Sequence, residues 1–392
     1  MLTSSAAQAL VFYGIGALAG AMIGLVSFHL VDLRQIYGFG LFEEGLALSI
    51  IALTRAALGL IVAIVISRVA VQPVLIAGLV ILGLSNILAI WSGSGTVFLL
   101  SRGLASVGFV SLVTALPSAI SAIGSIAVRQ ATMTMWGAYL PIGTALGIVM
   151  GMAAGQDWQL SFGLHTTLCA VMAGLLLLLP TKSADTVSET LDLRAFLSSV
   201  SVWLFALGFG TFAAVFLVVV GLLPSVLQDA TGLDRVDAGL SASFVCLAGV
   251  ATSVVLSIFT PNPAHFVWLV FSGFLASAAA SVLFFMNLDA PVTATFAAVL
   301  IIAFSALVPS VVFASFPLLV DDTRHIILLS GLVTQFGNMG SLFGPPAVSQ
   351  WSAVYGWSTA WLPLSLICLI GALLFILPGR RIARPAGSET LC

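Results

Sequence analysis

Two arginines lie inside long apolar stretches of the sequence, where a charged side chain is expensive. Arg55 lies well inside the apolar run 45–67, and Arg102 lies near the start of the run 97–123. A charge at the centre of a bilayer costs about 2.5–3.5 kcal/mol on insertion scales, so an arginine kept there is a candidate for a functional role. From the helical rise we expect Arg55 near mid-membrane, whereas Arg102 is close enough to its span end to snorkel to the interface.

The sequence supplies no carboxylate at these depths to pair with either arginine. All 14 acidic residues fall in predicted loops, the linker, the tail or the ends of apolar runs. An arginine stays charged, so it needs backbone carbonyls, water or an anion as its partner. An anion that comes and goes would be a substrate, and a guanidinium can hold a carboxylate through two parallel hydrogen bonds. The alternative is that Arg55 bonds the free carbonyls of a broken helix.

Polar and aromatic residues of three apolar runs are candidates to complete a substrate pocket with Arg55. They are Thr54, Trp136, Tyr139, Gln335 and Asn338. Gln335 and Asn338 are three residues apart, so they share one helix face.

The titratable residues near the predicted membrane are confined to the rims of the runs. They are His29, Glu43, Glu44 and His165. We expect them to be solvated or to lie at the interface. This arrangement disfavours proton coupling through a carboxylate at mid-membrane.

Glycines recur every four residues in the run 132–155, at Gly143, Gly147, Gly151 and Gly155. This spacing leaves one helix face without side chains, which lets a second helix approach to backbone contact. The first run repeats the pattern at Gly16, Gly20 and Gly24. We expect these faces to pack against other helices, either as a static contact or as a sliding contact between two halves of the protein.

The elements that carry these residues are predicted to be membrane-spanning helices. Hydrophobic residues make up 60% of the 392 residues and charged residues only 7%, whereas soluble domains are about a quarter charged. Apolar runs long enough to cross about 30 Å of hydrocarbon recur from end to end. They predict an all-α membrane protein with twelve transmembrane helices, near 7–31, 45–67, 72–91, 97–123, 132–155, 160–180, 197–226, 239–259, 265–286, 291–320, 326–349 and 358–378.

One long polar connection, 181–199, falls near the middle of the chain. It predicts a six-helix half at 1–180, a linker at 181–199, a second six-helix half at 200–380 and a tail at 381–392. Eight loop, linker and tail Lys and Arg residues fall on the side of the termini, and two, Arg34 and Arg235, fall on the other. Because positive charge favours the cytoplasmic side, we expect both termini inside the plasma membrane, which in a bacterium is the inner membrane.

The two halves repeat each other at a constant offset of about half the chain, which indicates internal duplication. Gly45 pairs with Gly239, and each opens a span after an acidic loop. Gly143 and Gly147 pair with Gly340 and Gly344, and Trp158 pairs with Trp357. Two parallel six-helix repeats predict a substrate site at their interface near mid-membrane.

These features resemble the major facilitator superfamily over essentially the whole chain. The glycine stripe with Pro141 is similar to the glycine-rich fifth-helix motif of that family, although the Gly-Pro pair of the motif is found instead at Gly344-Pro345. Arg102, Ser106 and Gly108 resemble its Arg-x-x-x-Gly-x-Gly motif, with serine in place of the first glycine. The resemblance implies conformational roles for Arg102 and the glycines.

The loop after the second run departs from the family pattern. Of the usual Gly-x-x-x-Asp-Arg-x-Gly-Arg sequence only Arg68 is present. The cytoplasmic charge latch that this loop supplies in the family is therefore not expected, nor is a close match to its best-known sugar and drug subfamilies.

We therefore predict a secondary active transporter that moves a small, anionic solute by alternating access, with Arg55 as its central anion-binding residue. Efflux of amphiphilic or drug-like compounds is the alternative within transport. A membrane-embedded enzyme or assembly factor is the alternative from another class. The sequence shows no nucleophile, metal-ligand or phosphate-loop motif, so we expect no enzyme activity and no cofactor. The expected partners are a small-molecule substrate and the lipid bilayer, not nucleic acid, with the monomer as the functional unit.

Overall fold

The structure is a computed structural model that describes residues 4–66, 69–136, 138–179, 198–258, 265–315 and 323–376. Most of the predicted linker 181–199 and the whole tail 381–392 lie outside the described residues. The exact boundaries of the halves therefore stay a prediction. The two halves are referred to below as the N-terminal half (described residues up to 179) and the C-terminal half (described residues from 198).

All secondary-structure elements of the described residues are helices. The N-terminal half contains α1 (Ser5–Tyr37), α2 (Leu41–Ser49), the 3₁₀ turn η1 (Ile50–Ala52), α3 (Leu53–Ile66), α4 (Val71–Ile90), α5 (Gly95–Ser121), α6 (Ile126–Trp136), α7 (Tyr139–Ala154) and α8 (Trp158–Leu177). The C-terminal half contains α10 (Val200–Thr231), α11 (Arg235–Ile258), α12 (Phe266–Met286), α13 (Pro291–Ser305), α14 (Leu307–Ala314), α16 (Thr323–Tyr355), η3 (Trp357–Thr359) and α17 (Trp361–Leu374).

These helices form the twelve predicted spans in two six-helix repeats. Nine helices in the described part are long and apolar enough to cross a membrane. Three further spans are α16 and the interrupted pairs α2–α3 and α6–α7. Each predicted run coincides with one of these twelve segments.

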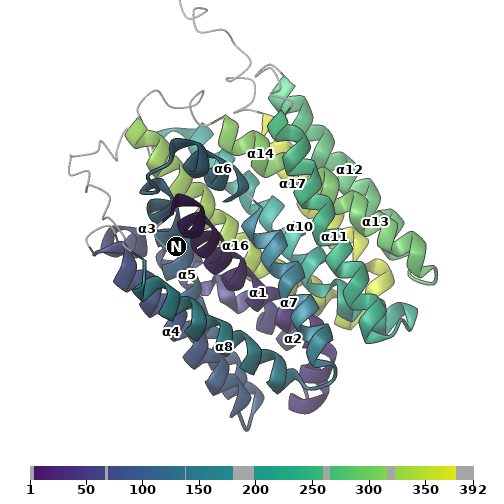
Figure 1. Cartoon of the computed structure of the whole chain (residues 1–392). Coiled ribbons are helices and arrows are strands. Elements are labelled where there is room, and N and C mark those ends of the chain that lie inside the picture. The colour runs from purple at the N-terminus through teal and green to yellow at the C-terminus, as the bar shows by residue number, and fades with distance from the viewer. Residues whose placement is uncertain are drawn as a thin grey trace, which may run out of the picture.

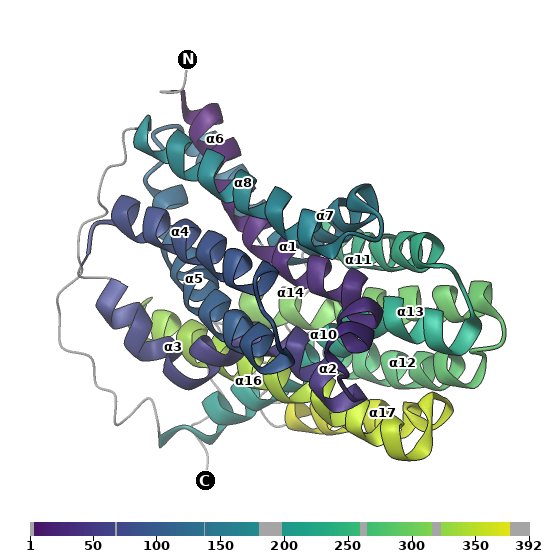
Figure 2. The same cartoon turned by 90° about the horizontal axis from the view of Figure 1, so that it is seen from below.

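The repeats are visible in how the helices pack. α1 packs along α7, and α10 packs along α16 in the equivalent arrangement. In the most apolar 18-residue windows of α1 and α10, 78% and 83% of the residues are buried inside the protein, against 28% for α8 and α11. Figures 1 and 2 show α1 and α10 running through the middle of the molecule, with α4, α8 and α12 toward its outside. The central helices therefore bring the two halves together, while the outer helices present apolar surface to lipid.

Several helices extend beyond the predicted runs, and this changes the environment of charged residues. α1 continues to Tyr37, where Gly38 ends it with a φ of 66° in the left-handed region that favours glycine. α2 begins at Leu41, before the predicted start at 45. The expectation that Glu43 and Glu44 belong to a loop was therefore wrong, because both lie in the first turn of α2.

Candidate functional site

Two interrupted helices position the predicted central residues. The 3₁₀ turn Ile50–Ala52 separates α2 from α3 and places Arg55 in the first turn of α3. The fifth span is likewise divided, with Trp136 at the end of α6 and Tyr139 at the start of α7. Discontinuous helices near mid-membrane are a recurring way to build transporter binding sites.

The structure brings Arg55, Tyr139 and Trp136 together. The Arg55 guanidinium interacts electrostatically with the Tyr139 side chain. The Trp136 and Tyr139 rings stack with their centroids 4.3 Å apart and their planes at 13°. All three side chains are partly exposed. Among the described residues, none forms a hydrogen bond or ion pair with the Arg55 guanidinium, so the alternative of an arginine held by helix carbonyls receives no support in this part of the chain.

Gln335 approaches the same region from the C-terminal half. Its Nε2 donates a hydrogen bond to the Ala56 carbonyl oxygen at 3.2 Å, next to Arg55. Thr54 shares a hydrogen bond with the Ser106 hydroxyl of α5. Asn338 instead donates to the Thr334 carbonyl of its own helix at 2.7 Å. Four of the five predicted partners therefore lie at or beside Arg55, while Asn338 has no contact with them among the hydrogen bonds of the described residues.

The glycines of α7 face α1 at backbone distance. A Cβ added to Gly147 would lie 2.8 Å from backbone atoms of both Ala21 and Leu25, and one added to Gly143 would lie 2.8 Å from Gly20 Cα. Gly151 fits against the Phe28 ring. This is a contact within the N-terminal half.

Gly155 does not belong to this packed face. It is the C-cap of α7, with a φ of 68°, and no atom lies within 4 Å of its ideal Cβ position. Its prediction as a fourth packing position was therefore wrong.

Gly340 and Gly344 of α16 repeat the arrangement in the C-terminal half. Gly340 lies against the Gly210 backbone, and a Cβ on Gly344 would lie 3.0 Å from Ala214 Cα. The alternative of a sliding contact between halves is wrong for the glycines of α7 and α16, because each packs on a helix of its own half. Their role in conformational change stays a prediction.

Close approach between the halves occurs instead at Gly45 and Gly239, which lie in the second turns of α2 and α11. A Cβ on Gly45 would lie 2.7 Å from Pro346 Cα of α16. A Cβ on Gly239 would lie 2.8 Å from the Phe28 ring and 3.3 Å from Ile148. By the internal repeat, the contact between α2 and α16 is equivalent to the contact between α11 and α7.

Arg102 is fully buried, so the expectation that it could snorkel to the interface was wrong. Its side chain has 0% exposure. Nε, Nη1 and Nη2 lack a hydrogen-bond partner among the described residues, and the guanidinium carbon lies 5.7 Å from the centre of the Phe162 ring. His165, predicted to lie at the rim, is also buried, where it bonds Asn86 and the Leu18 carbonyl. Helix α5 thus holds this charge inside the N-terminal half, against Phe162 of α8.

Charged residues join the halves at one end of the molecule. We call this the acidic end; it comprises the C-terminal ends of α1, α7 and α10 and the N-terminal ends of α2, α8 and α11. In a first cluster, Arg34 donates to both carboxylate oxygens of Asp229, at 2.6 and 2.5 Å, and to Glu44 at 3.1 Å. Glu44 is only 1% exposed and also accepts a hydrogen bond from Ser225. Asp229 and Ser225 both lie on α10, so their contacts with Arg34 and Glu44 cross between the halves.

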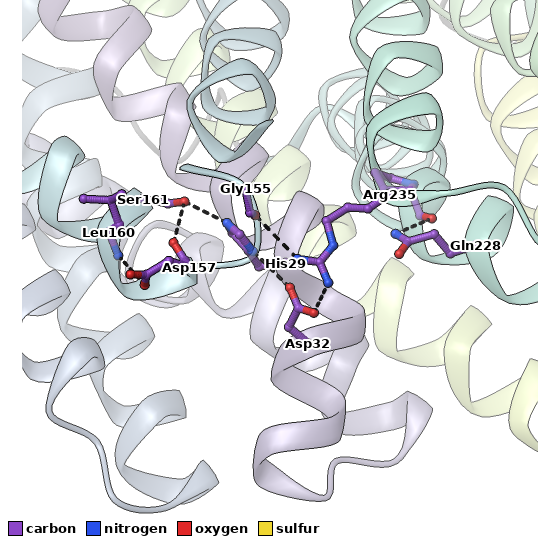
Figure 3. Close-up of polar contacts among 9 residues, drawn as sticks. His29, Asp32, Gly155, Asp157, Leu160, Ser161, Gln228 and Arg235 are labelled. Carbon is purple, nitrogen blue, oxygen red and sulfur yellow. Dashed lines mark hydrogen bonds and ion pairs between the residues drawn. The ribbon is translucent and has the colours of Figure 1, made fainter. Parts of the chain in front are cut away.

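A second cluster lies beside it and is shown in Figure 3. Asp32 of α1 accepts hydrogen bonds from Arg235 of α11 and from His29 Nδ1, the latter at 3.1 Å. His29 Nε2 lies 2.8 Å from the Ser161 hydroxyl of α8. Arg235 also donates to the Gly155 carbonyl at 3.5 Å, so the glycine at the end of α7 is part of this cluster. Together the two clusters link the halves at the acidic end.

These clusters are not predicted by the sequence. Their acidic residues are expected in loops or at the ends of spans and His29 at a rim, whereas His29 is fully buried. One signal was present: the acidic residues before Gly45 and before Gly239 mark equivalent helix starts in the two halves. Which charge of one half would meet which of the other depends on packing across the interface, and a single sequence does not contain that information.

Comparisons with known proteins were made for the whole chain. A family model described as Major Facilitator Superfamily matches residues 7–325. A solved structure of a bacterial homologue of the human lysosomal transporter Spinster, in an inward-facing and unoccupied conformation, is similar with a TM-score of 0.81 and 14% identity, over 96% of this chain and 97% of that one. The occupied inward-facing form has a TM-score of 0.77 and 14% identity, over 95% and 96%. No curated protein matches.

Proposed function

The chain belongs to the major facilitator superfamily, and from that premise we propose that it is a secondary active transporter for a small anionic solute. The fold and the family support a transporter that works by alternating access, rather than an enzyme. The anionic substrate and its recognition by Arg55 are the proposed part. In this proposal the substrate binds between the two halves and is exposed to each side of the membrane in turn.

One observation carries the choice of an anion. Arg55 lies at an interrupted helix, is partly exposed, and has no hydrogen-bond or ion-pair partner among the described residues. A guanidinium in an apolar membrane protein is stabilised by a polar or anionic partner. A carboxylate or similar oxyanion supplies it, and Tyr139, Trp136 and Gln335 offer a hydroxyl, an aromatic face and an amide beside it.

The contacts between the halves at the acidic end suggest which state of the transport cycle the structure represents. We propose that it is the outer end and that the structure corresponds to an inward-facing state, as in the similar solved structures. This orientation follows from the predicted excess of Lys and Arg on the opposite side. In this proposal both termini lie in the cytoplasm, and the protein acts as a monomer in the plasma membrane.

Binding of anions to the purified protein tests the proposal. Thermal melting is measured with sodium salts of aliphatic, aromatic and amino carboxylates, phosphate and sulfate, each paired with a neutral amide or ester where one exists. We expect at least one anion to raise the melting temperature, since a ligand at 100 times its Kd stabilises a protein by about 2.7 kcal/mol. Arg55→Lys keeps the charge but loses the forked geometry, so we expect roughly tenfold weaker binding or worse.

Arg129→Lys serves as the matched control, because Arg129 bonds the backbone carbonyl of Ser121 and makes no contact with the proposed site residues among the hydrogen bonds of the described residues. It should bind the anion as the wild type does. A panel in which no anion stabilises the protein, or in which Arg55→Ala responds like the wild type, contradicts the proposal. Stabilisation by neutral amphiphiles in both proteins would instead favour efflux of such compounds.

A further inference from the structure

The second cluster at the acidic end contains a buried histidine with a polar partner at each ring nitrogen. His29 is fully buried, and each ring nitrogen faces one polar partner. Nδ1 lies 3.1 Å from the Asp32 carboxylate and Nε2 lies 2.8 Å from the Ser161 hydroxyl. The Phe28 ring packs edge-on against the imidazole, with centroids 5.0 Å apart.

This arrangement accommodates both protonation states of the imidazole without moving a heavy atom. In the neutral ring, Nδ1–H donates to Asp32 and Nε2 accepts from the Ser161 hydroxyl. In the charged ring, Nε2–H donates to Ser161, whose hydroxyl then turns to the Asp157 carbonyl oxygen at 3.4 Å. Rotation of one hydroxyl group is therefore enough to take up a proton.

Two groups from different halves share the carboxylate of Asp32. Arg235 of the C-terminal half bonds Oδ1, while His29 of the N-terminal half bonds Oδ2. With the acidic end closed, Arg235 neutralises Asp32 and a neutral His29 leaves the pair balanced. When the halves separate at this end, Arg235 moves away with α11, and protonation of His29 then balances the charge of Asp32.

We infer that His29 and Asp32 form a proton-binding site that fills when the acidic end opens, so that acidification favours the open state. The open state binds one more proton than the closed state, and its population relative to the closed state can rise by up to about tenfold for each unit that the pH falls. This proton-binding site acts at the acidic end alone and does not depend on the identity of the transported solute.

The other charged groups around His29 are consistent with this exchange. On α1, Asp32 faces it directly and Arg34 is engaged with Glu44 and Asp229. From α8, Asp157 presents its backbone carbonyl to Ser161, while its carboxylate caps the helix at the Leu160 amide. From α11, Arg235 faces Asp32 and lies over the Phe28 ring at 6.0 Å. The neighbouring α7 contributes the Gly155 carbonyl to Arg235.

The test measures opening by the reactivity of a cysteine that is buried only while the acidic end is closed. Ser27 is fully buried on α1 and bonds the Gly221 carbonyl of α10 at 2.7 Å, so Ser27→Cys is the probe. The native cysteines are replaced, and the rate of maleimide labelling is divided by that of Val354→Cys, an exposed position, to cancel thiol ionisation. The full-length protein is used without added solute between pH 8 and 5.5.

We expect the relative labelling rate to rise several-fold to tenfold per unit of acidification over part of this range. His29→Gln, which keeps a neutral hydrogen-bonding side chain, should remove that rise. The matched control His265→Gln changes an exposed histidine at the start of α12 and should keep it. Arg235→Gln removes the competing cation and should raise the rate at every pH. A rate that does not change with pH in the wild type, or the same pH dependence in His29→Gln, would overturn the inference.

Discussion

Gly147→Leu is expected to lower the melting temperature of the purified protein. The ideal Cβ position at Gly147 is 2.8 Å from the backbone of both Ala21 and Leu25, and backbone atoms cannot turn aside as a flexible side chain can. Overpacking a tight contact costs about 1–3 kcal/mol, and a backbone contact along two central helices places Gly147 at the upper end of that range. Thermal melting in detergent, followed by intrinsic fluorescence, measures the effect.

Gly163→Leu is the matched control for this substitution. Gly163 also lies within a helix, α8, but no atom lies within 4 Å of its ideal Cβ position. Leucine is favoured over glycine in a helix by roughly 0.8 kcal/mol, so this variant should melt at or above the wild-type temperature. Equal melting of the two variants would contradict the view that the α1–α7 contact depends on bare backbone.

Arg34→Gln is expected to open the acidic end. The substitution removes the charged partner of Glu44, which is 1% exposed, and breaks the forked contact to Asp229. Truncating one partner of a buried charge pair costs 2 kcal/mol or more, largely because the other charge is left unpaired. About 2 kcal/mol corresponds to a roughly 30-fold shift toward the open state. The relative labelling rate at Ser27→Cys should rise accordingly at neutral pH.

A double variant separates an unpaired charge from a general loss of packing. Arg34→Gln combined with Glu44→Gln leaves no buried carboxylate without a partner, so much of the closed state should return. Arg129→Gln, which changes an arginine outside the acidic end, should label as the wild type does. If Arg34→Gln alone leaves the labelling rate unchanged, the first cluster does not hold this end closed.

The fold could be predicted from the sequence because its signals are local and repeated. Each apolar run must be a helix in lipid, since every backbone polar group has to be satisfied within the segment. The register that pairs Gly143 with Gly340 agrees with the structure, where the two glycines lie in the equivalent α1–α7 and α10–α16 contacts. The ends of the helices were less predictable, because α1 and α2 extend beyond the apolar runs and carry Arg34 and Glu44 within their terminal turns.

The candidate site could be predicted in part. A charge inside an apolar run marks Arg55 directly, and its neighbourhood with Tyr139 and Gln335 agrees with a site between the halves. Asn338 shares a helix face with Gln335 and is therefore predicted to line the pocket, but its side chain bonds the helix backbone instead. The burial of Arg102 and His29 could not be predicted from position in the run alone, because neighbouring helices rather than membrane depth cover these side chains.

Uptake of an anion into proteoliposomes tests the central claim most directly. The anion that stabilises the wild type best is supplied as a radiolabelled salt outside vesicles that contain the same unlabelled anion, so that exchange requires no coupling ion. The account predicts saturable exchange by the wild type, loss of exchange in Arg55→Ala, strong reduction in Arg55→Lys, and no exchange of the neutral analogue. Exchange of the anion by Arg55→Ala at the wild-type rate, with that variant as well folded as the wild type, would contradict recognition of the substrate by Arg55.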